Sequence, residues 1–494
     1  MRLRYRPSRS AALHGLALTA VAALAAGCGG DASDAGEREI EGATAPPDAP
    51  NVIVVMTDDQ DVPSMELMPI VQRQLVDRGV EFTNSFVAVS QCCPSRATFV
   101  TGQHAHNHKV KAGGPPKGGF SKLNSNNTLA VWLDKAGYET GQFGRYLNYY
   151  GEPDKGSDPL EVPRGWDEWH APVRHTGFQV YDYTLNENGE LVTYGDDPAD
   201  YATDVFARKA VEFIGRSAEE GTPFFAWITP AIPHTEGVLP DEGAVKNPRP
   251  APRDDGALED VPFPITPSFA EEDVSDKPEV VTRRMKFSGI DEPPPEYEAE
   301  FRGRIESLLA VDRLVGQLMR ALREAGELDN TYVVFTSDNG YMLGEHGQRG
   351  KALAYEESIR VPLVIRGPGL PEGERRENLV QNIDLAPTVV DVTGAEPRRE
   401  LDGISLIESA RGAGADDRDL LIEYFEAPNF AAVRSADGYT YVEYGEGAIE
   451  LYDLEEDPYQ LENVAGDPGY ADIQERLAGR LAELRACSGS EECS

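Results

Sequence analysis

Runs of apolar residues alternate with amphipathic stretches along the chain from residue 50 onward. The run NVIVVM at 51–56 is rich in β-branched residues and is followed by polar ones, which is typical of a strand buried in a parallel sheet. Further helices and strands are predicted at 68–78, 127–136, 139–143, 202–216, 223–229, 301–325, 331–336, 361–366 and 384–393. Their alternation predicts an α/β fold, with a mostly parallel central sheet flanked by helices.

Two parts of the chain depart from this alternation. Residues 240–300 are rich in Pro and acidic residues and lack a clear period, so we expect a long insertion at the surface. After about residue 410 short strands prevail, and Asp437 and Gly438 offer a hairpin turn between AAVRS and YTYVEY. A closing helix is predicted over 472–486. This pattern predicts a small C-terminal antiparallel-sheet subdomain.

The N-terminal region has the composition of an export signal followed by a linker. Four arginines precede an apolar stretch too short for a membrane helix, and small residues then lead to Cys28, as in bacterial lipoproteins. We predict an export signal over 1–27 and a flexible linker over 28–49, before a main domain at 50–410 and the subdomain at 411–494. The protein is expected to be anchored by a lipid on Cys28 to the outer face of the cytoplasmic membrane; secretion after plain cleavage is the alternative.

The charge of the chain excludes some partners. The 494 residues include 46 Lys and Arg against 85 Asp and Glu, which gives a net charge of −39. Nucleic acid phosphates repel such a polyanion, so we expect no nucleic acid partner and a small anionic ligand held in a local positive pocket. Hydrophobic residues make up 40% of the chain, which excludes disorder throughout. Cys487 and Cys493 lie six apart, and a small disulfide loop is their expected use in an exported protein.

The segment Q-C-C-P-S-R-A-T-F-V-T-G at 91–102 is the most informative for chemistry. Pro94 favours the start of a helix here. A thiol at a helix N-terminus beside Arg96 has a lowered pKa, so Cys92 or Cys93 can act as a nucleophile. From the residues alone, a buried and unreactive pair of cysteines is an equal alternative.

The same segment resembles the C-x-P-S-R-x-x-x-x-T-G motif of type I sulfatases. The resemblance implies an alkaline-phosphatase-like fold, hydrolysis of sulfate monoesters, and oxidation of Cys92 to formylglycine (3-oxoalanine) by a formylglycine-generating enzyme. The aldehyde hydrate carries two hydroxyls on one carbon: one attacks sulfur and expels the alcohol, and the other drives elimination of sulfate. Cys93, beside the modified residue, is then expected to be a buried free thiol.

Two acidic segments extend the resemblance. Asp58 and Asp59 follow the first strand, and Ser337-Asp338-Asn339-Gly340 follows the strand VVFT. By resemblance Asp58, Asp59, Asp338, Asn339 and the modified Cys92 hold a divalent metal. Three carboxylates and an amide oxygen suit Ca²⁺, with Mg²⁺ as the alternative, and the cation would lower the pKa of the hydrate. Asp58 and Asp59 alone would more simply cap a helix or lie in an exposed turn.

Four cationic positions complete the likeness. Arg96 is expected to hold the hydrate, His234 to bind sulfate and protonate the departing oxygen, and Lys351 to neutralise charge on the sulfate. Arg145 stands where the family normally has Lys. Arginine keeps the charge but cannot lose a proton, so any acid role passes to His234 or Lys351. The alternatives are a structural histidine and a solvated surface lysine.

The text R-Y-L-N-Y-Y-G around Arg145 resembles K-Y-L-N-x-Y-G of N-acetylglucosamine-6-sulfatases and heparan endosulfatases. This likeness covers most of residues 50–370 and implies that Asn148 touches a sulfated sugar such as N-acetylglucosamine 6-sulfate. Leu147 stands where the sulfatase family commonly has a histidine. Met342 stands where these relatives usually have one, and His346 is a candidate substitute for it.

Three other interpretations fit parts of the pattern. A phosphate or phosphonate monoester hydrolase of the same superfamily could use the same residues. A non-catalytic surface protein that binds sulfated glycans would not require the intact motif at Cys92. His104, His106 and His108 alternate as in a zinc site, but the hard-oxygen ligands elsewhere favour packing or a pocket wall for them.

Overall fold

The computed structural model describes residues 45–46, 49–237, 247–413 and 418–494. The predicted export signal, Cys28 and the linker up to residue 44 lie outside the described residues. Residues 42–494 cluster as one compact unit, and the division predicted at residue 410 stays a prediction. Within the described part of the chain no helix has the length and apolar character needed to cross a bilayer.

A ten-stranded sheet forms the centre of this unit, and most of its central strands are parallel. β1 (Asn51–Thr57) pairs in parallel with β8 (Phe224–Thr229) and β9 (Thr331–Ser337), and β8 in turn pairs with β4 (Glu139–Gly144). The predicted mostly parallel sheet is therefore confirmed. The full order is β13 (Glu374–Arg376), β2 (Val80–Phe82), β12 (Leu363–Arg366), β9, β1, β8, β4, β5 (Glu168–Pro172), β6 (Thr184–Glu187) and β7 (Glu190–Thr193), in which β12, β6 and β7 run antiparallel to their neighbours.

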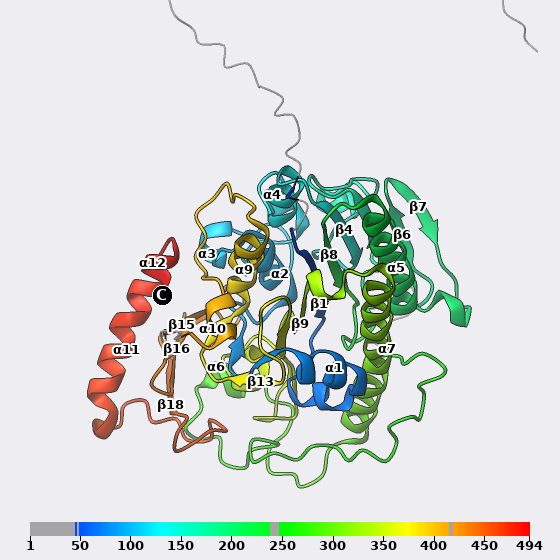
Figure 1. Ribbon diagram of the computed structural model, residues 1–494. Coiled ribbons are helices and arrows are strands. Elements are labelled where there is room, and N and C mark those ends of the chain that lie inside the picture. Colours follow the sequence, from blue (N-terminus) through cyan, green and yellow to red (C-terminus); the bar gives the residue numbers. More distant parts are fainter. Residues whose placement is uncertain (1–44, 47–48, 238–246, 414–417) are drawn as a thin grey trace, which may run out of the picture. The chain divides into compact units, whose positions relative to one another are not determined.

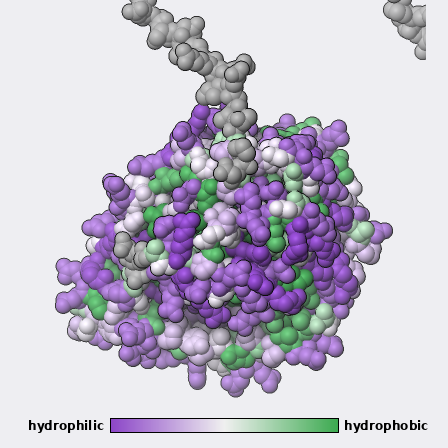
Figure 2. Space-filling model, viewed as in Figure 1, coloured by the Kyte–Doolittle hydropathy of each residue, from purple (hydrophilic) through white to green (hydrophobic). Residues whose placement is uncertain are grey.

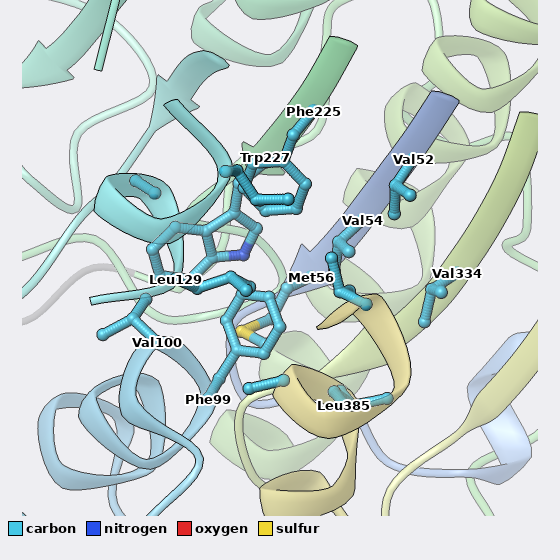
Figure 3. Packing of buried hydrophobic residues seen from close by; sticks show 14 of the residues in the cluster. Val52, Val54, Met56, Phe99, Val100, Leu129, Phe225, Trp227, Val334 and Leu385 are labelled. Atoms are coloured by element: carbon cyan, nitrogen blue, oxygen red, sulfur yellow. The ribbon is translucent and has the colours of Figure 1, made fainter. Parts of the chain in front are cut away.

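Helices cover both faces of the sheet, and β1 contributes to both cores. Val52, Val54 and Met56 face Phe99 and Leu385 and the helices that carry them (Figure 3). Ile53 and Val55 belong to the second core cluster, which contains side chains of a second set of helices. Figure 1 shows helices on both faces of the sheet. Each such buried side chain stabilises the fold by roughly 1.5–3 kcal/mol. The first set is α2 (Cys92–Thr101), α4 (Leu129–Lys135) and α9 (Leu385–Thr393), and the second is α1 (Pro69–Gln74), α5 (Ala202–Glu220) and α7 (Pro295–Ala325).

A smaller antiparallel sheet follows near the C-terminus, as predicted. β16 (Phe430–Arg434) and β17 (Tyr439–Tyr444) form the hairpin expected at Asp437-Gly438, and Gly438 has φ +89°. β15 (Leu420–Tyr424) and β18 (Ile449–Asp453) flank them, and α11 (Ala471–Leu484) packs Leu477, Leu481 and Leu484 on the sheet. The disulfide Cys487–Cys493 is formed.

Three element boundaries differ from the sequence pattern. The helix expected over 68–78 is α1 plus a separate 3₁₀ turn at Val76–Arg78. The alternating apolar and polar segment VEFTNSFVAVS at 80–90 divides into β2 and β3 (Ser85–Phe86), which belong to different sheets. α7 begins at Pro295, six residues early, because proline is well accommodated in a first turn. The remaining short elements are α3 (Ala105–His108), α6 (Glu279–Thr282), α8 (Glu356–Ile359), α10 (Ile407–Arg411), α12 (Ser490–Cys493), β10 (Met342–Leu343), β11 (Arg349–Gly350) and β14 (Val380–Gln381).

One face of the molecule is mostly hydrophilic (Figure 2). Hydrophilic residues predominate on the face drawn in Figure 2, and apolar residues form small separated groups between them. The chemistry is therefore expected inside the fold, at the carboxyl ends of the parallel strands.

Candidate active site

The carboxyl ends of β1 and β9 bring the two acidic segments together. Thr57 is the register partner of Ser337, so the residues that follow each strand emerge side by side. The amide of Asp338 donates to the carbonyl of Thr57 (3.1 Å), and the amide of Asp59 donates to a carboxylate oxygen of Asp338 (3.2 Å). Asp58, Asp59 and Asp338 are all buried. Parallel pairing thus concentrates three carboxylates in the interior.

Arg96 is wholly buried and links these carboxylates to the first turn of α2. Its Nε donates to Asp338 Oδ2 (2.7 Å), its Nη2 to Asp58 Oδ2 (3.0 Å) and its Nη1 to the carbonyl of Tyr146 (3.3 Å). A buried ion pair of this kind is costly to break, because removing one partner leaves a buried charge without compensation. All three guanidinium nitrogens are therefore engaged, and Arg96 orients the acids rather than contacting Cys92.

Cys92 is the first residue of α2 and faces two cations. Its Sγ lies 3.4 Å from Arg145 Nη2 and 3.6 Å from Lys351 Nζ. Burial raises the pKa of Cys92 and outweighs the charges of Lys351 and Arg145. Burial likewise raises the pKa of Cys93, to about 12, and its thiol is buried and free. The lowered thiol pKa expected from the helix N-terminus is wrong, so an unmodified cysteine here is a poor nucleophile.

Lys351 and His234 lie against Asp59. Lys351 Nζ donates to Asp59 Oδ1, and His234 Nε2 lies 3.6 Å from Asp59 Oδ2. Burial acts to lower the pKa of Lys351, but Asp59 and Cys92 outweigh it and raise that pKa. Burial also lowers the pKa of His234, and here it prevails over the attraction of Asp59. His234 Nδ1 donates a hydrogen bond to the carbonyl oxygen of Thr235 (2.6 Å).

Arg145 follows β4, and its guanidinium contacts both Asp58 and Cys92. Its guanidinium donates to Asp58 through Nη1 and to Asn148 through Nη2. Although burial opposes the charge, Asp58 and Cys92 raise the pKa of Arg145. A pocket of about 260 Å³ opens beside it, lined by Arg145, Asn148 and Phe178 among others. Asn148 therefore lies where the sequence places a substrate contact.

Leu147 and Met342, which depart from the family pattern, and His346, the candidate substitute, are all buried. Leu147 and Met342 are buried in apolar clusters and act as core residues. His346 is also buried: its Nδ1 is 2.9 Å from Glu271, and its ring stacks on Tyr355 at 3.9 Å. None of these partners belongs to the cluster around Cys92, so the structure gives His346 no contact with that cluster.

The alternating histidines serve packing, as expected. Burial lowers the pKa of His104 and of His108, the latter to about 3, so both are neutral. His106 pairs through Nδ1 with Glu423 (2.9 Å), a carboxylate partner the sequence pattern did not indicate. His104 approaches two sulfur atoms, but Cys487 and Cys493 are joined in the disulfide and cannot bind zinc.

The donors around Asp58 fit a hard divalent cation. Ligand atoms of Asp58, Cys92 and Asp338 lie within 4.8 Å of one another, as do those of Asp58, Asp59 and His234. Asp58 Oδ1 and Asn339 Oδ1 are buried and accept no hydrogen bond. Unsatisfied buried oxygens are costly, and a cation would satisfy both. Among these donors, the oxygens of Asp58, Asp59, Asp338 and Asn339 suit Ca²⁺ or Mg²⁺.

Three further residues that no sequence motif marks support this cluster. Arg304 on α7 donates to the carbonyl of Pro233 (3.3 Å) and to that of Asp59. Arg284, in the long insertion, donates to the carbonyls of Lys351 (2.9 Å) and Ala352 (2.8 Å). Phe178 lies against Arg145 and His234. These roles depend on tertiary contacts alone, so no local pattern could have indicated them.

Comparison with known proteins identifies the family. The Sulfatase family model matches residues 50–395, and the model "N-sulphoglucosamine sulphohydrolase, C-terminal" matches residues 344–487. Human N-acetylglucosamine-6-sulfatase is 32% identical over 490 residues, covering 89% of this chain and 85% of that protein. The putative extracellular sulfatase Sulf-1 homolog of Caenorhabditis elegans is 36% identical over 366 residues; the match covers 72% of this chain but only 48% of that protein.

Solved structures agree on the fold. One, of a protein in complex with its substrate D-glucosamine-2-N,6-O-disulfate, superposes with a TM-score of 0.75 at 24% identity, over 88% of this chain and 97% of that one. The phosphonate monoester hydrolase from Silicibacter pomeroyi gives 0.67 at 24% identity, over 89% and 96%. The alkaline-phosphatase-like architecture expected from the sequence is confirmed. The chain belongs to the sulfatase family and is a sulfuric ester hydrolase.

Proposed function

We propose that the protein is a formylglycine-dependent and metal-dependent sulfatase that removes sulfate from a small sulfated sugar such as N-acetylglucosamine 6-sulfate. The proposal rests on the charged groups that surround the sulfur atom of Cys92. Its Sγ lies within 3.6 Å of the nitrogens of Arg145 and Lys351 and beside the carboxylates of Asp58 and Asp338. An anion held at this point would meet two cations and a metal-binding set of oxygens.

Two groups beyond the genetically encoded side chains complete the proposed site. Asp58, Asp59, Asp338 and Asn339 would hold the cation, Ca²⁺ or Mg²⁺, which as a Lewis acid polarises a sulfate oxygen and lowers the pKa of a nearby hydroxyl. Formylglycine at Cys92 would supply a hydrate with one hydroxyl to attack sulfur and a second to expel the sulfate. The raised pKa of the Cys92 thiol supports a modified residue over a thiolate.

The remaining residues bind the sulfate and manage charge. Arg145 and Lys351 are positively charged in the resting site, so both would attract the sulfate and stabilise negative charge that develops on it. Lys351 or His234 would give a proton to the departing alcohol oxygen, because a guanidinium does not release one. Arg96 would act at one remove, by fixing Asp58 and Asp338.

The sugar assignment is supported by the relatives and by the pocket. Several curated relatives are named N-acetylglucosamine-6-sulfatase, and they match most of this chain. The pocket of about 260 Å³ beside Arg145 and Asn148 is large enough for one sugar ring. The net charge of −39 should also disfavour long polyanions, since field repulsion grows with substrate charge.

Export and processing form part of the same proposal. The N-terminal composition and the relatives named extracellular sulfatases support an exported protein. The Cys487–Cys493 disulfide suits an oxidising compartment. A formylglycine-generating enzyme would act on Cys92 before the chain folds, since Cys92 is buried in the fold, and a lipid on Cys28 would tether the product to the membrane.

A comparison of substrates tests the proposal. Purified protein, coexpressed with a formylglycine-generating enzyme, is assayed for sulfate release from N-acetylglucosamine 6-sulfate and from an aryl sulfate, and for hydrolysis of an aryl phosphonate monoester. We expect kcat/KM for the sugar sulfate to exceed that for the phosphonate by at least about 100-fold, about 2.7 kcal/mol of transition-state discrimination. Equal or faster phosphonate hydrolysis would contradict the assignment and favour the phosphonate hydrolase alternative.

A further inference from the structure

Phe178 lies against two of the proposed sulfate-binding residues at once. The Cζ atom of Arg145 is 4.1 Å from the centroid of the Phe178 ring, within the range of a cation–π contact. The imidazole of His234 stacks on the same side chain, with ring centroids 4.2 Å apart and planes inclined by 25°. Phe178 also lines the pocket of about 260 Å³ that opens beside Arg145.

The segment that carries Phe178 is fixed on both sides of it. Gln179 Nε2 donates to the carbonyl of Gly237 (2.6 Å), in the loop that also carries His234. On the other side, His175 Nδ1 is 2.9 Å from a carboxylate oxygen of Glu152. Arg174 and His175 both have positive φ, +56° and +64°, a strained conformation that the surrounding contacts must maintain. The ring is thus held in place by its own loop, independently of Arg145.

We propose that Phe178 is a positioning residue that fixes the planes of the Arg145 guanidinium and the His234 imidazole. A guanidinium is planar, and its two terminal nitrogens are here directed at different acceptors, Asp58 and Asn148. Rotation of that plane would turn Nη2 away from Cys92 as well. The ring face restricts this rotation, because a cation is attracted to the face and a planar cation stacks on it.

The orientation of the His234 ring also depends on a second contact. Its Nδ1 is anchored on the carbonyl of Thr235, but a single hydrogen bond leaves the ring free to tilt about that contact. Stacking on Phe178 removes this freedom and keeps Nε2 directed toward Asp59. One aromatic side chain therefore orients two groups that reach the cluster from different strands, Arg145 after β4 and His234 after β8.

A double-mutant cycle tests the proposal. Its activity readout rests on the proposed function, whereas its stability readout does not. The variants are F178L, which removes the ring but keeps an apolar side chain, R145K, which keeps the charge but removes the plane, and the double variant. We expect F178L to lower kcat for the sulfate ester at least tenfold, and to lower it by a smaller factor in the R145K background, where only the contact with His234 remains to be lost. F178Y keeps the ring face and should retain at least half of the wild-type kcat.

The matched control is F263L, since Phe263 is a half-buried phenylalanine of the insertion that packs on Phe269 and Phe301. It should leave kcat unchanged. Equal losses for F178L in the wild-type and R145K backgrounds, or a loss in F178Y as large as that in F178L, would overturn the positioning role and leave a general packing effect.

The same double-mutant cycle can be measured by thermal unfolding, which does not require an active enzyme. In protein with unconverted Cys92, the decrease in the unfolding midpoint of the double variant should be smaller than the sum of the decreases in the two single variants, because the contact between the two side chains is lost only once. Strictly additive losses would overturn the proposed contact. If the wild type releases no sulfate while the unfolding cycle is non-additive, the proposed function fails and the positioning contact stands.

Discussion

Lys351 Nζ lies 3.6 Å from Cys92 Sγ, although 259 positions separate the two residues in the sequence. Two features of the fold bring them together. β10 and β11 pair as a short hairpin after β9 and turn the chain back toward the sheet. Arg284 then holds the carbonyls of Lys351 and Ala352, and Ala352 has φ +71°. The lysine is thus delivered to the N-terminus of α2 by a constrained turn.

Removal of the Lys351 charge should abolish most of the activity. We expect Lys351→Met to lower kcat for sulfate ester hydrolysis by about 10²–10³-fold, because a half-buried cation that stabilises developing negative charge is lost. Lys122→Met, on an exposed lysine, is the matched control and should retain wild-type kcat. Comparable rates for Lys351→Met and the wild type in steady-state kinetics would remove Lys351 from the mechanism.

The turn that carries Lys351 should depend on Arg284. Arg284→Ala deletes two hydrogen bonds to backbone carbonyls, so we expect kcat to fall about tenfold as the lysine loses its fixed position. The neighbouring Arg283 makes only an exposed ion pair with Glu279, and Arg283→Ala should change kcat by less than twofold. If the two alanine variants behave alike, Arg284 has no special role in placing Lys351.

Calcium should stabilise the fold through Asp58 and Asn339. Their unsatisfied oxygens would gain a ligand, and binding at about 100 times the dissociation constant adds about 2.7 kcal/mol to the free energy of unfolding. We expect EDTA to lower the unfolding midpoint, calcium to restore it, and Asn339→Ala to reduce the calcium-dependent shift. An unfolding midpoint independent of both Ca²⁺ and Mg²⁺ would contradict a metal at this site.

The sequence predicts most of the site because the site is built from strand ends and one helix start. The residues after β1 and β9 could be paired in advance, since parallel neighbours end at the same edge of the sheet. Cys92 and Arg96 could be placed by the motif that opens α2. What the pattern predicts wrongly is the environment: burial of Cys92 raises its pKa, and sequence spacing does not report burial.

The missed residues share one property. Phe178, Arg284 and Arg304 act through side-chain contacts with segments distant in the chain, and each lies in a stretch without a recognisable motif. The same limit explains His346, which the spacing after Gly-Tyr suggests as a substrate contact but which the fold packs between Glu271 and Tyr355. Tertiary packing decides these positions.

His106 should make stability depend on pH. Burial acts to lower its pKa, but the hydrogen bond and charge of Glu423 prevail, so the folded pKa lies above 6.5. The folded state then binds the proton more tightly than the unfolded state, and this contribution is complete below the unfolded pKa and is lost as pH rises through the folded one.

We therefore expect the unfolding midpoint to fall as the pH rises above about 6.5, and to fall less in His106→Gln. Subtracting the two curves removes the other titrating groups, including the buried histidines 104 and 108, which are already neutral over this range. Parallel curves for the wild type and His106→Gln in calorimetry would show that the Glu423 pair contributes no pH-dependent stability.

The proposed reaction requires that Cys92 is converted to formylglycine and then used in catalysis. The most direct measurement is the mass of the peptide that contains Cys92, together with sulfate release, in protein coexpressed with and without a formylglycine-generating enzyme. With the enzyme, we expect the peptide to have the mass of the aldehyde in place of that of the thiol. Activity should be proportional to the converted fraction and absent in Cys92→Ala. Full sulfate release by protein in which Cys92 remains a thiol would contradict it.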